Sequence, residues 1–169
     1  MRTKKKRALA LATVSACAVG IAGGAAAQQK DVMIGEQCDR TGPTQIVGVN
    51  LCPAIMDYVN LINSRGGVEG YRIKLDEIDN EYKVPPAVEA YQRHKQQGAI
   101  SIMLYGTPQT MALTQKLTED RVPGTSPGFG TSASANGTRY PYTFPIAASY
   151  WSQTAAADRL GGLEGKKIA

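Results

Sequence analysis

From residue 31 onward, the spacing of apolar and polar residues divides the chain into strand-like and helix-like segments. Residues 71–79 alternate apolar and polar side chains, the period of a strand with one buried face. Between residues 51 and 62, apolar side chains recur every three or four positions, which predicts a helix with one buried face. The positions expected on that face are Leu51, Ile55, Tyr58, Val59 and Ile62. Residues 99–104 form a short apolar run bounded by glycines, which is typical of a buried parallel strand.

Proline and glycine set the expected ends of the helices. Pro53 is tolerable only in the first turn of its helix, which should stop at residues 66–67. Residues 85–86 are two prolines that suit the first turn of a second helix. Thr107 is expected to be the N-cap of a third helix, with Pro108 at its first helical position.

The order of the segments predicts the fold class. Further strands are expected at 32–38, 122–125 and 142–147, and further helices at 84–97, 107–120 and 150–160. Alternation of this kind predicts an α/β fold with a mostly parallel sheet and helices on both faces. Ligands of such folds bind at the carboxyl ends of the strands, so the loops after residues 34, 78, 104, 125 and 146 are the expected site.

The first 27 residues have the features of a signal peptide. Five basic residues precede an apolar stretch from Ala8 to Ala25, and three alanines at residues 25–27 form a small-residue cleavage site. The mature protein is therefore expected to begin at Gln28 and to work outside the cytoplasm. A membrane anchor is disfavoured because Leu, Ile and Val are sparse in this stretch. A lipoprotein box ending at Cys17 is the second alternative for this segment.

Removing this segment changes the meaning of the charge. The formal net charge of +5 comes from the five basic residues of the signal, so the remainder is formally neutral. No basic cluster longer than Lys166-Lys167 survives, which argues against nucleic acid as a partner. The mature length suffices for one domain with a real core.

The cysteines and the histidine bear on cofactors. Cys38 and Cys52 would face an oxidising compartment, where either a disulfide worth about 3 kcal/mol or two buried free thiols is possible. His94, the single histidine, is expected to be solvated on the polar side of the second helix. These residues do not make up a four-ligand zinc set, and no cofactor is expected.

Residues 124–128 match the G-x-S-x-G pattern of serine hydrolases, with Ser126 as the nucleophile. Three features oppose this reading. Pro127 has no N–H for an oxyanion, no helix follows the pattern, and His94 precedes Ser126 in the chain. We therefore expect no enzyme, and a G-x-G-x-x-A match at residues 128–133 is assigned to a loop.

Residues 105–110 join a buried strand to a helix through Gly106. Free N–H groups and the positive end of the helix dipole would converge there, which suits a carboxylate. An ordinary capped helix explains Thr107 and Pro108 equally well.

Residues 63–70 resemble the N-x-x-G-G-[IV]-x-G turn of periplasmic amino-acid and amide binding proteins of ABC importers, the branched-chain amino-acid group. Four other segments resemble the same family in the same order. They are Thr41-Gly42-Pro43, Gly106-Thr107 with Thr110, 122–130 and 161–169. The resemblance covers residues 31–169.

The resemblance implies the first lobe of a type I periplasmic binding protein, whose two α/β lobes close on a small ligand and pass it to a membrane permease. It implies that Gly106 and Thr107 hold the ligand carboxylate and that Tyr150 lines the cleft. The loop after the fourth strand would complete the grip with Ser126, Gly128, Phe129 and Gly130. The departures from the branched-chain pattern are Tyr82, Tyr105, Phe129 and Trp151, and they permit an aromatic or amide ligand.

The resemblance also divides the chain: 1–27 is the signal peptide, 28–165 the first lobe and 166–169 the start of the second lobe. The family's ammonium-binding acid would belong to the rest of the second lobe. The chain is then expected to be a fragment or a truncated product. The expected function is a periplasmic solute-binding subunit; a ligand-sensing lobe of a receptor is the alternative.

Overall fold

The computed structural model describes residues 30–126, 128–131 and 136–162. The expected signal peptide and the expected start of a second lobe lie outside these residues. Within them, five strands and four helices follow one another in the expected order. The strands are β1 Lys30–Cys38, β2 Tyr71–Asp79, β3 Ser101–Met103, β4 Gly124–Ser126 and β5 Thr143–Pro145. The helices are α1 Gln45–Ser64, α2 Val84–Gln96, α3 Thr107–Asp120 and α4 Tyr150–Gly161.

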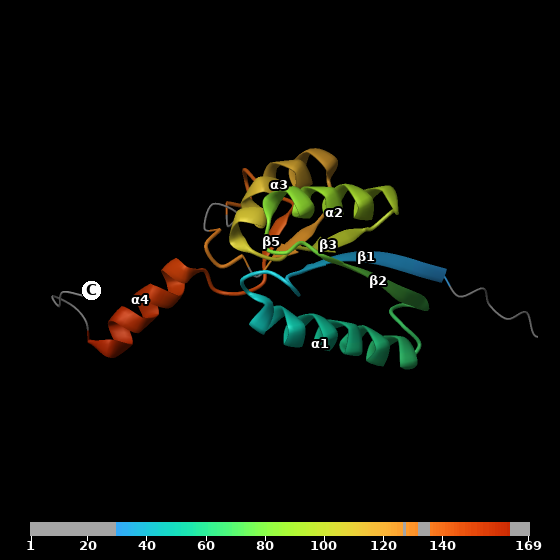
Figure 1. Cartoon of the computed structure of the whole chain (residues 1–169), viewed down its shortest axis with the longest axis horizontal. Coiled ribbons are helices and arrows are strands. Elements are labelled where there is room, and N and C mark those ends of the chain that lie inside the picture. Colours follow the sequence, from blue (N-terminus) through green and yellow to red (C-terminus); the bar gives the residue numbers. More distant parts are fainter. Residues whose placement is uncertain (1–29, 127, 132–135, 163–169) are drawn as a thin grey trace, which may run out of the picture.

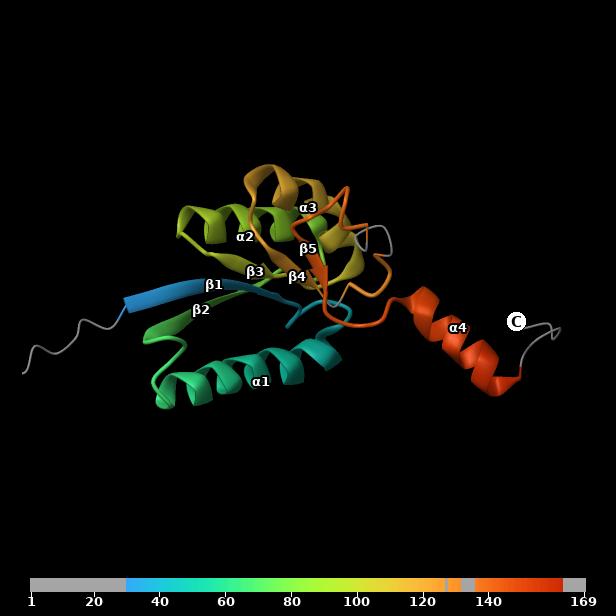
Figure 2. The same cartoon turned by 180° about the vertical axis from the view of Figure 1, so that it is seen from behind.

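The five strands form one sheet in the order β2-β1-β3-β4-β5, and every neighbouring pair is parallel. Helices α2 and α3 cover one face, and α1 lies on the other (Figure 1). The expected α/β class is therefore confirmed. Helix α4 projects away from the sheet in both views (Figures 1 and 2), and none of its residues is buried.

The main core lies between the sheet and the layer of α2 and α3. Its fully or nearly fully buried members are Tyr91, Ile102, Leu104, Leu113 and Leu117. These are residues that the apolar patterns place on the inner faces of β3 and α3 or on the inner side of α2. This core fixes the positions at which β3 and α3 meet, and that junction is part of the site described below.

Helix α1 differs from expectation in its start and in its buried face. It begins at Gln45, so Pro53 lies inside the helix and not in its first turn. The buried residues of α1, which face the sheet, are Gly48, Cys52 and Val59. At Gly48 the helix lies so close to the backbone of Asp39 that any side chain would collide with it. Two residues expected on the buried face, Leu51 and Tyr58, are instead 38% and 63% exposed.

Length and composition alone would allow α1 to cross a membrane. In this fold it covers part of the sheet, with Cys52 buried against it.

His94 is fully buried, so the expectation of a solvated histidine was wrong. Its ring packs against Gly35 of β1, where any side chain would collide with it. The His94 Nε2 atom lies 3.5 Å from Oδ2 of Asp76. Burial lowers the pKa of His94, and the Asp76 carboxylate opposes this shift. The histidine therefore belongs to the packing between α2 and the sheet.

Candidate functional site

Residues from several loops surround a cavity of about 210 Å³ at the carboxyl ends of the strands. We call it the cleft pocket. Six expected site residues line it: Tyr82, Tyr105, Gly106, Thr107, Phe129 and Tyr150. Thr44, Val47 and Leu51 complete the lining. The cavity lies where an open parallel sheet usually binds its ligand.

The turn between β3 and α3 forms the polar end of the cleft pocket. Gly106 is the N-cap residue of α3 and has φ 93°, a conformation that favours glycine. A side chain there would also collide with Gln109 and Tyr82. Thr107 is therefore the first helical residue and not the N-cap, and Pro108 is the second. No side chain caps this helix end, and its first N–H groups have no partner within the helix.

The hydroxyl of Thr107 serves a different purpose from capping. It accepts a hydrogen bond of 3.2 Å from the backbone N–H of Gly130, which joins the start of α3 to the loop after β4. Because the hydroxyl accepts this bond, its own proton is directed elsewhere. Thr107 also lines the cleft pocket, so this proton can point into the cavity.

Ser126, at the end of β4, takes part in a hydrogen-bond network within the protein. Its hydroxyl accepts from the N–H of Gly128 at 2.7 Å and lies 2.5 Å from the hydroxyl of Thr110. Thr110 in turn donates to the carbonyl of Gly106 at 2.8 Å. Ser126 is 5% exposed. His94, the histidine that the serine-hydrolase pattern would require as a base, packs instead against Gly35 of β1. This arrangement gives Ser126 a role in positioning the two loops.

Two pairs of aromatic rings line the cleft pocket. The rings of Tyr82 and Tyr105 meet edge to face with their centroids 6.3 Å apart. Those of Phe129 and Tyr150 are 5.5 Å apart and tilted by 49°. Tyr150 also donates its backbone N–H to the carbonyl of Phe129 at 2.9 Å, which ties the start of α4 to the loop after β4. The four rings give the pocket a mostly apolar wall.

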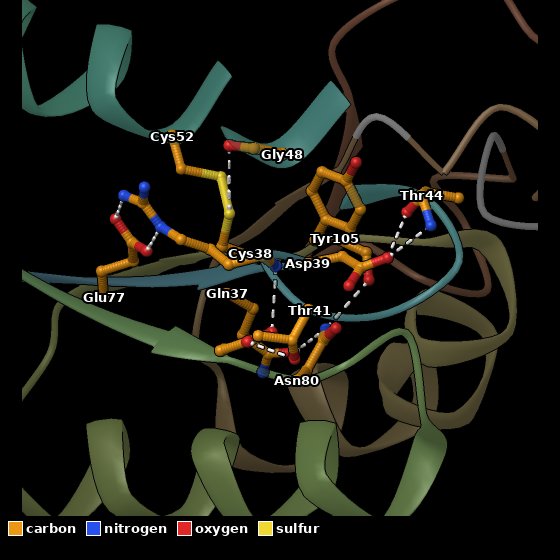
Figure 3. Close-up of a disulfide and its surroundings, with 12 residues drawn as sticks. Gln37, Cys38, Asp39, Thr41, Thr44, Gly48, Cys52, Glu77, Asn80 and Tyr105 are labelled. Atoms are coloured by element: carbon orange, nitrogen blue, oxygen red, sulfur yellow. Dashed lines mark hydrogen bonds and ion pairs between the residues drawn. A yellow bond between two sulfur atoms is a disulfide. The ribbon is translucent and has the colours of Figure 1, made fainter. Parts of the chain in front are cut away.

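Asn80 holds the Tyr82 loop beside the Tyr105 loop. This fully buried amide accepts from the N–H of Tyr82 at 2.9 Å and donates to the carbonyl of Tyr105 at 3.2 Å. It also donates to the Gln37 side chain at 3.2 Å (Figure 3). Sequence patterns did not single out Asn80, because its role depends on strands that are distant in the chain.

The α1 side of the cleft pocket is set by Asp39, which follows β1 directly. Its buried carboxylate accepts from the backbone N–H and the hydroxyl of Thr44, at 2.8 and 2.6 Å, and from the N–H of Gly42 at 2.5 Å. A disulfide joins Cys38 to Cys52, whose Cα atoms are 6.4 Å apart (Figure 3). These contacts fix the first turns of α1 next to the pocket.

The other expected residues lie beside the cleft pocket. Ser126 and Gly128 line a neighbouring cavity of about 270 Å³, and Phe129 borders both cavities. Gly130 contributes its N–H to Thr107. Trp151, on α4, is 72% exposed. In the described part of the chain, no group of three or more His, Cys, Asp or Glu residues is arranged to hold a metal ion.

Solved structures share this fold. The chain resembles a branched-chain amino acid ABC transporter protein from Thermus thermophilus with bound valine (TM-score 0.75, 22% identity, 82% of this chain and 36% of that one). It also resembles a fatty acid ABC transporter substrate-binding protein from Thermomonospora curvata (TM-score 0.69, 23% identity, coverage 83% and 34%). A third is an ABC transporter solute binding protein from Rhodopseudomonas palustris BisB5 in complex with 3,4-dihydroxy benzoic acid (TM-score 0.61, 22% identity, coverage 70% and 32%).

The chain thus spans about a third of the length of each of these structures. No curated protein matches the sequence. The family model of the periplasmic binding proteins matches residues 31–169, which include every described strand except the first residue of β1. By this match and by its fold, the chain belongs to the periplasmic binding protein family.

Proposed function

We propose that this chain is the first ligand-binding lobe of an extracytoplasmic solute-binding subunit of an ABC importer. It captures a small amino acid, amide or related carboxylate and delivers it to a membrane permease. The observation that carries the proposal is the cleft pocket itself, in which a helix N-terminus and four aromatic rings converge at the carboxyl ends of the strands. The expected signal peptide supports export.

The polar end of the pocket suits the carboxylate of a ligand. The first N–H groups of α3 and the positive end of its dipole attract an anion. Thr107 adds a hydroxyl proton, because its oxygen already accepts from Gly130. Gly106 carries no side chain, so a ligand oxygen approaches the backbone closely.

The aromatic wall suits a flat or apolar ligand body. Tyr82, Tyr105, Phe129 and Tyr150 supply ring faces and edges that pack well against an aromatic group. We therefore favour an aromatic acid or amide over a short polar amino acid. Among the similar structures, one holds valine and another holds a dihydroxybenzoic acid, so the fold accommodates both aliphatic and aromatic carboxylates.

Thermal melting in the presence of benzoate, 4-hydroxybenzoate, phenylacetamide and leucine tests the proposal. Because one lobe alone is expected to bind with a dissociation constant in the millimolar range, each compound is added at about ten times that constant, where binding adds about 1.4 kcal/mol to the free energy of unfolding and raises the melting temperature measurably. The variant Thr107→Val should lose most of the stabilisation by a carboxylate.

Thr118→Val is the matched control, because Thr118 lies in the last turns of the same helix and donates to the carbonyl of Thr114. Absence of any shift across the four compounds contradicts the proposal. An equal shift in wild type and Thr107→Val contradicts the assigned position of the carboxylate.

A further inference from the structure

A second cavity, of about 250 Å³, lies on the face of the sheet that carries α1 and adjoins the cleft pocket, with which it shares the lining residues Leu51, Tyr105 and Phe129. We call it the α1-side cavity. Strand residues Glu36, Met103 and Thr125 contribute to it, and Leu51 and Ile55 of α1 form part of its wall. Apart from Glu36 and Gln37, its lining is largely apolar. The carboxylate contacts proposed above, at the start of α3, do not involve Glu36, Met103 or Thr125, which line this second cavity alone.

The register of the strands explains why Glu36 points into this cavity. Glu36 pairs with Met103 of β3, and Met103 pairs with Thr125 of β4. Paired residues on neighbouring strands project from the same face of a sheet, and consecutive residues project from opposite faces. Gly35 accordingly meets His94 on the other face, while Glu36 faces α1.

The carboxyl group of Glu36 has no internal partner. Its side chain is 1% exposed, and neither oxygen accepts a hydrogen bond from any residue that the structure describes. Burial, and to a lesser extent the neighbouring Glu77, raise the pKa of Glu36 to about 7 against the opposing effect of Arg40. Arg40 does not serve as a partner, because its guanidinium forms a two-point ion pair with Glu77.

We propose that the α1-side cavity binds a small organic cation, an ammonium group on a compact apolar body, with Glu36 as its counter-ion. The apolar lining contacts the body of the ligand. The carboxyl oxygens of Glu36 are covered in this structure, so the side chain turns toward the cavity to accept from the ammonium N–H groups. When Glu36 is protonated beforehand, binding releases that proton to solvent, and the ammonium keeps its own. An anion would be repelled by Glu36 and Glu77, and a neutral apolar molecule would leave the carboxyl without a partner.

Calorimetric titration of the chain with benzylamine tests this inference, with benzyl alcohol as the neutral molecule of similar shape. Benzylamine should bind more tightly than benzyl alcohol. Its affinity should be about tenfold higher at pH 8 than at pH 6, because Glu36 is mostly ionised only at the higher pH. At pH 7, titrations in two buffers of different ionisation enthalpy should show about half a proton released per amine bound.

The variant Glu36→Gln keeps the shape of the side chain and should abolish both the preference for the amine and its pH dependence. Glu119→Gln removes an exposed carboxylate on α3 and should bind benzylamine as wild type does. Equal affinity in Glu36→Gln and wild type overturns the inference, and so does the absence of binding at millimolar benzylamine. If Glu36→Gln fails to fold, the wild-type titrations test the inference instead: an affinity that does not depend on pH, or binding without proton release, overturns it. The inference stands apart from the proposed function, since failure of carboxylates to bind the cleft pocket leaves it unchanged.

Discussion

At the scale of the residue, the buried carboxyl of Glu36 makes the fold less stable as the pH rises toward 7. Its pKa is raised from 4.5 to about 7 in the folded state, so the folded chain holds the proton more tightly than the unfolded chain does. The contribution of Glu36 is therefore neutral below pH 4.5 and becomes increasingly unfavourable up to pH 7. Above that pH its cost levels off at about 3 kcal/mol.

Glu36→Gln should consequently stabilise the chain at alkaline pH. The glutamine amide resembles a protonated carboxyl in shape, but it cannot ionise. The gain in the free energy of unfolding should be about 2 kcal/mol larger at pH 8 than at pH 5. Urea denaturation at both pH values measures it, with Glu119→Gln as the control that should show no such difference. A gain that is independent of pH would mean that Glu36 does not titrate in this range.

At the scale of the element, the disulfide ties the end of β1 to the middle of α1. Cys38 and Cys52 are 0% and 1% exposed, and their sequence separation is 14 residues. Closing a loop of this size stabilises a fold by about 3 kcal/mol in the chain-entropy model. The bond therefore holds the first turns of α1 in place beside the cleft pocket.

Reduction of the disulfide should lower the free energy of unfolding by about 3 kcal/mol. Urea denaturation with and without dithiothreitol measures the difference. Alkylation of the unfolded, unreduced protein followed by mass spectrometry should leave Cys38 and Cys52 unlabelled. Labelling of both residues, together with equal stability in the two conditions, would show that the thiols are free.

Elements that depend on local sequence could be predicted, and those that depend on distant contacts could not. The alternation at residues 71–79 and the prolines at residues 85–86 are local signals, and β2 and α2 lie where they indicate. The burial of His94 depends instead on the missing side chain at Gly35, which only the folded sheet brings next to it.

The candidate site likewise combines residues that local patterns indicate with residues whose positions depend on distant contacts. The junction of β3 and α3 was recognisable from Gly106 and Pro108. That Gly106 is the N-cap residue, and that the Thr107 hydroxyl bonds to the loop after β4, depend on contacts with Gln109 and Gly130. Thr44 was missed as a lining residue because its place is set by hydrogen bonds to Asp39.

At the scale of the whole molecule, the chain spans about a third of the length of the binding proteins that it resembles. Affinity in two-lobed binding proteins comes from closure of both lobes around the ligand. The described residues supply one wall, made of the start of α3, the loop after β4 and the aromatic rings. We therefore expect this chain alone to bind its ligand weakly, with a dissociation constant in the millimolar range, about 4 kcal/mol of binding free energy.

The most direct test of the central claim is an NMR titration of the ¹⁵N-labelled chain with 4-hydroxybenzoate, a method that detects weak binding. The account predicts that the backbone amides of Thr107 and Gln109, at the start of α3, shift most, and that Thr107→Val reduces those shifts. If the largest changes fall elsewhere, or if none appears at millimolar concentration, the cleft pocket is not a carboxylate site.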